Sequence, residues 1–381
     1  MPTSRPPLGD SSPLVPPLYQ SSVYTIPDLD ALDRIMDGKA PGFIYARDAH
    51  PNARQLAEEL ATLEAASWSV INGSGMAAIS AIVLGTVRQG DRIVASNRLY
   101  GRTTQLFQQE LARFGVQTTF VDTSDLDSVR DALKQPARLL FVETMSNPLL
   151  RLSDIEALAG LAHDRDCRFI VDNTFATPVL TKPLELGADL VMESLTKMIG
   201  GHSDVTLGAV CGRDPELLPQ ISQVASIWGL ASNPFDAWLA QRGLLTLPLR
   251  MKAASANAAA LADWLAIQPA VSRVLYPGRK EHPDHELAAR LLAGGFGNML
   301  CFEHRDGREG VNRFMRLASG IPFSPSLAHT TTTCSHPGTT SHRYVSPAEK
   351  KRQGISDGLV RLSVGVEDLE QIKEEMGKGL K

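Results

Sequence analysis

The segment between residues 168 and 204 carries most of the information on the fold. It reads Arg168-Phe-Ile-Val-Asp172-Asn-Thr-Phe, then Leu186-Gly-Ala-Asp-Leu-Val-Met-Glu-Ser194-Leu-Thr196-Lys197, and soon afterwards two glycines. One short apolar run ends on an acid, and the next ends on hydroxyl groups and a lysine. Apolar runs of this length, bounded by polar residues and glycine, are typical of buried strands.

Similar runs recur on both sides of this segment. Strand-like stretches such as 91–96 and 138–143 alternate with helical patterns, which predicts a mostly parallel sheet covered by helices. A long alanine-rich helix is expected over 251–266, and strands and helices mix after it. We therefore expect an α/β protein with an N-terminal arm (1–50), a large domain (51–250) and a smaller C-terminal α/β domain (251–381).

Composition fits a large globular protein. The chain has 381 residues, of which 43% are hydrophobic and 21% charged, enough for two sizeable cores. Its net charge of −4 and lack of a basic cluster argue against nucleic acid as a partner. No apolar run reaches the length of a membrane span, so we expect no membrane association and a cytoplasmic location. The four scattered cysteines and the histidines show no metal-ligand spacing, so no metal is expected.

An acid after one strand and a lysine after another are what a pyridoxal phosphate site requires. That cofactor withdraws electrons from a substrate's α carbon while its ring nitrogen is protonated, and a buried carboxylate favours the protonated form. Asp172 is the candidate carboxylate. Lys197 is the candidate for the lysine that carries the cofactor covalently and acts as a general base, which requires a lowered pKa.

A second motif predicts a phosphate site. Asn72-Gly-Ser-Gly75-Met76 follows a probable strand and opens a helix. Free backbone amides at a helix start, together with the helix dipole, bind anions. Ser194 and Thr196 stand close enough to Lys197 in sequence to donate to the same phosphate.

Nearly the whole chain resembles the Cys/Met-metabolism family of pyridoxal phosphate enzymes. That family includes cystathionine γ-synthase, the cystathionine lyases, methionine γ-lyase and the homoserine sulfhydrylases. The shared motifs stand in family order: Tyr45-Ala-Arg47-Asp-Ala-His-Pro51, Ser74-Gly75-Met76-Ala-Ala, Tyr100-Gly101-Arg-Thr103, Glu143-Thr-Met-Ser146-Asn147-Pro148, Val171-Asp-Asn-Thr-Phe, Ser194-Leu-Thr-Lys197, Gly201-His-Ser-Asp204, Arg242-Gly-Leu-Leu-Thr-Leu, Ser326-Leu327 and Gly358-Leu-Val-Arg361-Leu-Ser-Val-Gly.

The resemblance implies the aspartate aminotransferase type of fold (fold type I) and further site residues. Tyr100 would stack on the cofactor ring and help to transfer protons. Arg361 would bind the substrate α-carboxylate through its guanidinium fork, assisted by Asn147 and Ser326. The backbone amides of Gly75 and Met76 would join Ser194 and Thr196 around the phosphate, and Lys197 and Asp172 would keep the roles given above.

The resemblance also implies an oligomer. Tyr45 and Arg47 match a tyrosine and an arginine that complete the phosphate site of a neighbouring subunit in this family. A homodimer would then be the smallest active unit, and such dimers usually pair into a homotetramer. The N-terminal arm would contact the neighbouring subunit.

Three departures from the family pattern concern the choice of substrate. His50-Pro51-Asn52 replaces a frequent Asn-Pro-Thr, and Arg102 stands where glycine or cysteine is usual. Cystathionine-handling members tend to have a glutamate in the stretch that here contains Thr330–Thr333. This difference weakens the cystathionine hypothesis, and the later 336–342 motif is closer to the sulfhydrylases and methionine lyases.

We therefore expect a γ-elimination or γ-replacement at carbon–sulfur or carbon–oxygen bonds of sulfur amino acids or O-acylhomoserine, in cysteine and methionine metabolism. A cystathionine- or methionine-γ-lyase-like reaction is favoured. The alternatives are O-acetylhomoserine sulfhydrylase, cystathionine γ-synthase and cystathionine β-lyase. A non-catalytic homologue that retains pyridoxal phosphate is the alternative from a different class. The physiological substrate, the β-versus-γ choice and the roles of Arg102 and the threonine run stay open.

Overall fold

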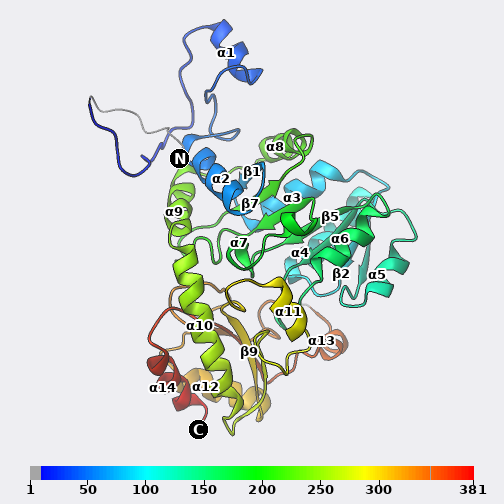
Figure 1. The fold of residues 1–381 in the computed structure, drawn as a ribbon, viewed down its shortest axis with the longest axis vertical. Coiled ribbons are helices and arrows are strands. Elements are labelled where there is room, and N and C mark those ends of the chain that lie inside the picture. Colours follow the sequence, from blue (N-terminus) through cyan, green and yellow to red (C-terminus); the bar gives the residue numbers. More distant parts are fainter. Residues whose placement is uncertain (1–9, 344) are drawn as a thin grey trace.

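The computed structural model describes residues 10–343 and 345–381 (Figure 1). In this part of the chain, seven strands form a sheet in the order β1-β7-β6-β5-β4-β2-β3. β7 runs antiparallel to both of its neighbours, and the other pairs are parallel, so the predicted mostly parallel sheet is confirmed. The strands are β1 (Trp68–Asn72), β2 (Arg92–Ser96), β3 (Gln117–Val121), β4 (Leu139–Glu143), β5 (Arg168–Asp172), β6 (Leu190–Glu193) and β7 (Gly208–Gly212).

Helices cover both faces of this sheet. On β4, Leu140 and Val142 pack into one buried cluster, while Leu139 and Phe141 pack into another, because alternate side chains of a strand point to opposite faces. The first cluster includes side chains of α2 (Pro51–Leu63), α5 (Leu126–Ala132), α6 (Ile155–His163) and α9 (Pro234–Leu244), and the second those of α3 (Gly75–Thr86) and α8 (Leu217–Ile227). Shorter segments are α4 (Gly101–Gln105), η1 (Leu106–Glu110), η2 (Leu111–Phe114), α7 (Thr177–Leu180) and η3 (Pro183–Leu186).

A smaller antiparallel sheet lies in the C-terminal third, in the order β10-β11-β9-β8. Helices α10, α12 and α14 lie beside this sheet (Figure 1), and their side chains contribute to its core. The predicted domain boundary at residue 250 falls within α10, and the division into domains stays a prediction. The elements are α10 (Leu247–Ala266), β8 (Val271–Leu275), α11 (His285–Leu291), β9 (Met299–His304), α12 (Gly307–Leu317), β10 (Thr333–Ser335), α13 (Pro347–Gln353), β11 (Leu359–Ser363) and α14 (Leu369–Gly379).

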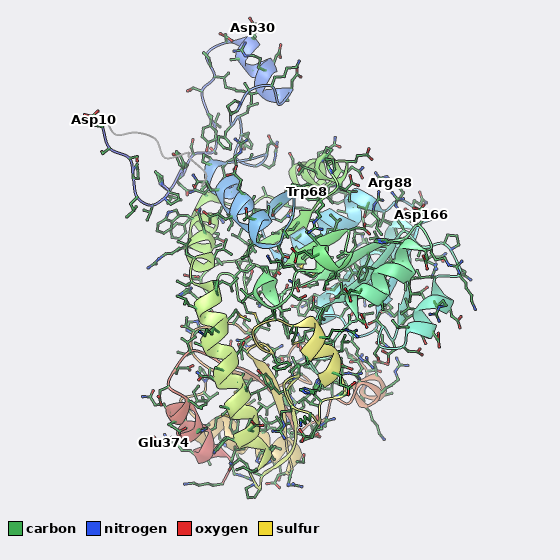
Figure 2. All side chains as sticks on the ribbon, in the orientation of Figure 1. Asp10, Asp30, Trp68, Arg88, Asp166 and Glu374 are labelled. Atoms are coloured by element: carbon green, nitrogen blue, oxygen red, sulfur yellow. The ribbon has the colours of Figure 1, made fainter. Side chains whose placement is uncertain are left out.

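The N-terminal arm and its helix α1 (Leu29–Met36) stand away from the rest of the molecule, where Figure 2 labels Asp10 and Asp30. The base of the arm is fixed, because the side-chain amide of Asn52 donates to the carbonyl of Pro17 at 2.9 Å. Leu14 and Leu29 remain 85% and 77% exposed. Exposed leucines on a projecting arm favour a contact with another chain, but that contact stays a prediction. No helix in the described residues is both long and apolar enough to cross a membrane.

The structure explains one departure from the family pattern. His50 caps helix α2: its Nδ1 accepts a hydrogen bond from the amide of Ala53 at 3.1 Å, and its Nε2 lies 3.2 Å from the Ser232 hydroxyl. Burial lowers the pKa of His50 to about 4, so the ring is neutral and Nδ1 is free to accept. Histidine here performs the capping role that asparagine usually has.

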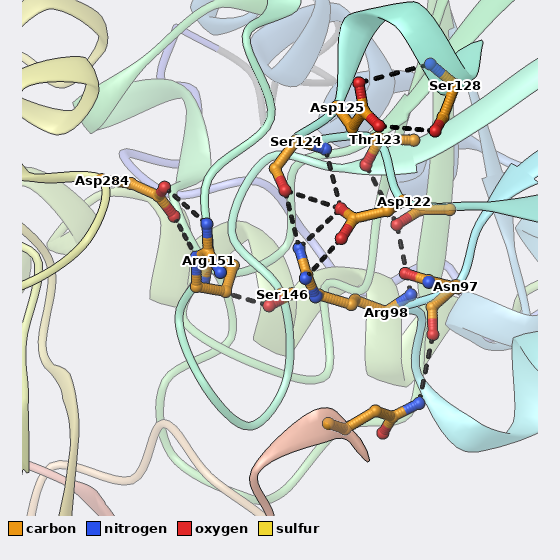
Figure 3. A network of polar contacts seen from close by, with 12 residues as sticks. Asn97, Arg98, Asp122, Thr123, Ser124, Asp125, Ser128, Ser146, Arg151 and Asp284 are labelled. Atoms are coloured by element: carbon orange, nitrogen blue, oxygen red, sulfur yellow. Dashed lines mark hydrogen bonds and ion pairs between the residues drawn. The ribbon is translucent and has the colours of Figure 1, made fainter. Parts of the chain in front are cut away.

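Ion pairs hold the loops that follow strands β2, β3 and β4 in place (Figure 3). Arg98, after β2, makes two hydrogen bonds of 2.9 and 2.7 Å to the carboxylate of Asp122, after β3. Arg151 pairs with Asp284, which directly precedes α11. The backbone amide of Arg151 also donates to the hydroxyl of Ser146 at 3.0 Å. The loop that carries Asn147 is therefore anchored to the C-terminal third of the chain.

Candidate active site

The carboxyl ends of the parallel strands meet at a cavity of about 220 Å³, the usual place for a ligand in this type of sheet. The cavity brings together most of the residues that the sequence singled out, although they come from β11 and from the ends of β1, β2, β4, β5 and β6 with the loops that follow them. Its lining includes Gly75, Met76, Tyr100, Asn147, Asp172, Ser194, Thr196, Lys197 and Arg361, together with Glu143, Met145, Thr174, Phe175, Pro325, Leu327 and Ser341.

Lys197 lies in the turn directly after β6. Its Nζ donates to the hydroxyl of Ser326 at 3.0 Å, which brings Ser326 to the same site. Burial, and to a smaller extent the positive charge of Arg361, lower the pKa of Lys197 to about 8. A substantial fraction of neutral amine, the form that reacts with an aldehyde and accepts a proton, is therefore present near neutral pH.

Arg250, on α10, holds the turn that follows Lys197. Its guanidinium donates to the carbonyls of Met198 at 2.6 Å and Ile199 at 3.0 Å. Gly201 has φ +72°, and a Cβ there would lie 2.1 Å from the guanidinium, so this position requires glycine. Sequence analysis missed Arg250, because it stands about fifty residues from the turn within an ordinary helical pattern.

Asp172 ends β5 and faces the cavity. One carboxylate oxygen accepts from the amide of Thr174 at 3.0 Å. Burial raises the pKa of Asp172, and the hydrogen bonds of Thr174 oppose this rise. A protonated ring nitrogen beside it would supply the missing positive charge, so this buried carboxylate fits the cofactor.

The start of α3 forms an anion cradle. The hydroxyl of Ser74 accepts from the amide of Ala77 at 3.0 Å, which leaves the first amides of the helix, Gly75 and Met76, to face a ligand. A Cβ on Gly75 would lie 2.9 Å from the side chain of Ser194, so glycine keeps the cradle open. These residues fit a phosphate group.

The hydroxyl of Thr196, which is predicted to bind the phosphate, already makes two hydrogen bonds within the protein. Its hydroxyl donates to the carbonyl of Leu207 and accepts from the amide of the same residue, each at 3.1 Å. To donate to a phosphate, the hydroxyl must release the Leu207 carbonyl. The role predicted for Thr196 therefore requires a small rotation.

Arg361 lines the same cavity as Lys197, and both residues hydrogen-bond to Ser326. Its guanidinium donates to the side-chain oxygen of Asn147 at 2.7 Å and to the carbonyl of Ser326 at 3.1 Å. Burial lowers the pKa of Arg361 to about 10, and the group still carries its charge near neutral pH. Its Nε is buried without an acceptor among the described residues, which leaves a donor for a substrate carboxylate.

Tyr45 and Arg47 lie away from the active-site cavity of their own chain. They are exposed, the guanidinium lies 5.1 Å from the centre of the tyrosine ring, and neither lines the cavity of its own chain. Tyr100, by contrast, lines the cavity and is 39% exposed. The structure of one chain therefore brings Tyr100 to the site but leaves Tyr45 and Arg47 away from it.

The other departures from the family pattern also lie outside the cavity lining. Arg102 is exposed and its guanidinium donates to the side chain of Gln105 at 2.7 Å. In the threonine run, the hydroxyl of Thr332 donates to Glu367 at 3.1 Å, and Thr333 begins strand β10. The run therefore has a structural role, and the neighbouring wall of the cavity is formed by Pro325 and Leu327.

Comparisons with known proteins agree with this site. Residues 5–381 match the family model described as Cys/Met metabolism PLP-dependent enzyme. The O-succinylhomoserine sulfhydrylase of Pseudomonas aeruginosa is 42% identical, covering 90% of this chain and 85% of that protein. The L-methionine gamma-lyase of Fusobacterium nucleatum subsp. polymorphum is 39% identical, covering 96% and 93%.

Solved structures give the same answer for the fold. The cystathionine gamma synthase from Xanthomonas oryzae pv. oryzae, in complex with cystathionine, superposes with a TM-score of 0.91 at 37% identity, covering 96% of this chain and 92% of that one. The predicted resemblance is confirmed over almost the full length. The chain is a pyridoxal phosphate-dependent enzyme of the Cys/Met metabolism family.

Proposed function

We propose that this enzyme cleaves the bond between the γ carbon of an amino acid and a sulfur or oxygen leaving group, by elimination or replacement. One observation carries the proposal: the Lys197 amine, with its pKa lowered to about 8, faces a cavity that also contains Asp172 and Arg361. γ-chemistry needs one base that reaches both the α and the β hydrogens of a fixed substrate.

The residues that line the cavity have separate roles in this reaction. Arg361 and Asn147 hold the substrate α-carboxylate, which fixes the α hydrogen relative to the amine of Lys197. When bound, pyridoxal phosphate supplies an electron sink for the α carbon, and Asp172 keeps its ring nitrogen protonated. Lys197 removes the α hydrogen, releases that proton to become a neutral amine again, and then removes a β hydrogen, after which the γ substituent leaves with the electron pair of its bond. The hydroxyl of Ser326, 3.0 Å from Nζ, keeps the amine directed into the cavity.

The lining favours a substrate whose far end carries no ammonium group. Among the described residues, the carboxyl groups that line the cavity belong to Glu143 and Asp172, and both accept hydrogen bonds from backbone amides. The wall beside Ser326 is apolar, with Pro325 and Leu327. Methionine or an O-acylhomoserine suits this wall better than cystathionine does, since a charged ammonium is costly to bury unpaired.

The test compares substrates on the cofactor-loaded enzyme. L-Methionine, O-succinyl-L-homoserine, O-acetyl-L-homoserine and L-cystathionine are each incubated with and without sulfide, and products are identified by chromatography. We expect 2-oxobutyrate or a γ-replacement product from at least one of the first three, at a higher kcat/KM than from cystathionine. Pyruvate from cystathionine as the main reaction would establish β-cleavage instead. Absence of any product would support the non-catalytic homologue.

We further propose that two subunits complete each phosphate site through Tyr45 and Arg47, in a homodimer or a pair of homodimers. The remote position of both residues within one chain supports this arrangement. Mixing inactive Lys197→Ala and Arg47→Ala variants tests it: random re-pairing should restore about a quarter of wild-type activity, because half of the dimers contain one intact site. No recovery after demonstrated subunit exchange would contradict a shared site. The cytoplasmic location expected from the sequence stays a prediction.

A further inference from the structure

Glu143 connects two loops of the active site that carry different functions. It is the last residue of β4, it is 7% exposed, and it lines the cavity. One carboxylate oxygen accepts from the backbone amide of Tyr100, and the other accepts from the amide of Asn147 at 3.2 Å. A single side chain thus fixes both the residue expected against the cofactor ring and the residue bound to Arg361.

We propose that Glu143 is a positioning residue that fixes the Tyr100 ring relative to the substrate-carboxylate pocket. The inference rests on the proposed function for its kinetic consequence, but not for its structural one. Without Glu143, the loops after β2 and β4 would lose their common anchor. The α hydrogen of a substrate held by Asn147 and Arg361 would then be less well aligned with the ring and with Lys197.

The charge of Glu143 has to be separated from its geometry. Glu143 stands opposite Asp172 in the register of β4 and β5. Burial, and then the negative charge of Asp172, raise the pKa of Glu143 well above its usual range. Burial and the neighbouring carboxylate of Asp172 therefore favour the protonated form of Glu143 more than water does for an exposed glutamate.

Substitutions distinguish the two effects. Glu143→Gln is neutral and isosteric, but its amide nitrogen is a donor that faces a backbone donor, so one of the two hydrogen bonds is lost. Glu143→Ala removes both acceptors. Glu143→Asp keeps a carboxyl group but shortens it by one methylene, which prevents it from reaching both amides. If Glu143 acts by accepting both hydrogen bonds, all three variants should have less well anchored loops and lower activity. If Glu143 acts only through its charge, Glu143→Asp should resemble the wild type.

The experiment combines hydrogen exchange with kinetics on the cofactor-loaded enzyme. Peptides that contain the Tyr100 and Asn147 amides are followed by mass spectrometry in deuterated water. Steady-state kcat and KM are measured with the best substrate found above. Glu64→Gln serves as the matched control, because Glu64 is also a fully buried glutamate but lies outside the cavity lining.

In Glu143→Ala we expect both peptides to exchange about tenfold faster or more, with a combined fall in kcat/KM of about 10- to 100-fold from lower kcat and higher KM. Glu143→Gln should release one of the two amides, and Glu64→Gln should change neither. Unchanged exchange in Glu143→Ala would overturn the proposal. An increase spread over the whole sheet would also overturn it, because Glu143 would then support the fold rather than the two loops.

The exchange measurement separates this proposal from the proposed function. If the wild type has no γ-activity but the two peptides respond as expected, the positioning role stands and the assigned reaction fails. If the wild type is active and all three Glu143 variants match it in exchange and kinetics, the positioning role fails alone. Glu143→Gln keeps the test valid if Glu143→Ala does not fold.

Discussion

Replacing Glu64 by glutamine should make the enzyme more stable at alkaline pH. Glu64 caps the C-terminal end of α2 and is fully buried, with one oxygen 3.4 Å from the side-chain nitrogen of Asn173. Burial raises the pKa of Glu64 from 4.5 to about 7, and hydrogen bonds with Glu193 and Asn173 oppose this rise. Burial and the nearby Glu64 raise the pKa of Glu193 well above its usual range.

The sign follows from proton binding. Between pH 4.5 and about 7, the folded protein keeps a proton on Glu64 that the unfolded chain has lost. The free energy of unfolding therefore decreases as the pH rises, and from about pH 5.5 to about pH 8 the loss is about 2 kcal/mol. Glutamine does not titrate, and its oxygen can still accept from Glu193. The Glu64→Gln variant should therefore gain about 2 kcal/mol relative to the wild type over the same pH interval.

Urea unfolding of both proteins with saturating cofactor, at the two pH values, measures this gain. Comparing the variant with the wild type reports the titration of Glu64 together with its effect on the neighbouring Glu193, because the two proteins share every other titrating group. Glu58→Gln on the same helix is the control: Glu58 is exposed, so its carboxylate is hydrated in the folded and the unfolded state. A stability difference between Glu64→Gln and the wild type that does not change with pH would refute the reasoning.

Three further predictions concern the active site. In cofactor-free protein, competitive acetylation should give Lys197 a midpoint near pH 8, since burial lowers its pKa to about 8; a midpoint near that of an exposed lysine would contradict this. Arg361→Lys should raise KM by about tenfold or more with a smaller change in kcat, because lysine lacks the forked guanidinium group that Asn147 holds in place. An unchanged KM would show that Arg361 does not bind the substrate carboxylate. Arg250→Met should release two carbonyls of the lysine turn and accelerate cofactor loss, measured by absorbance during dialysis; retention equal to the wild type would contradict a clamping role.

Sequence reasoning placed Asp172 and Lys197 in one site from their chemistry and their position after strands, and both line the same cavity, while their roles stay predictions. Asp172 and Lys197 each follow an apolar strand, and parallel strands deliver such residues to one edge of the sheet. The mostly parallel sheet was predicted from the alternation of strand and helix patterns, whereas the mixture of strands and helices after it predicted a smaller α/β domain but not its antiparallel sheet. The resemblance to the family added Arg361 and Asn147, which are 214 residues apart and in contact in the structure.

The residues that sequence reasoning missed act through contacts that leave no local pattern. Glu143 was visible at the end of a strand, but its role depends on which loops lie beside it. Arg250 reaches its turn across about fifty residues, and the neutral state of His50 depends on burial. Each required the three-dimensional arrangement, because neither periodicity nor spacing encodes which distant amides a side chain meets.

The central claim is that Lys197 removes α and β hydrogens so that a γ bond breaks. The most direct test is to incubate cofactor-loaded enzyme with O-acetyl-L-homoserine in deuterated water, with and without sulfide, and to follow the products by proton magnetic resonance. The account predicts acetate together with 2-oxobutyrate or homocysteine that carries deuterium at the former β carbon, and neither product from Lys197→Ala. Exchange of the α hydrogen alone, with the bond from the γ carbon to oxygen intact under both conditions, would contradict it.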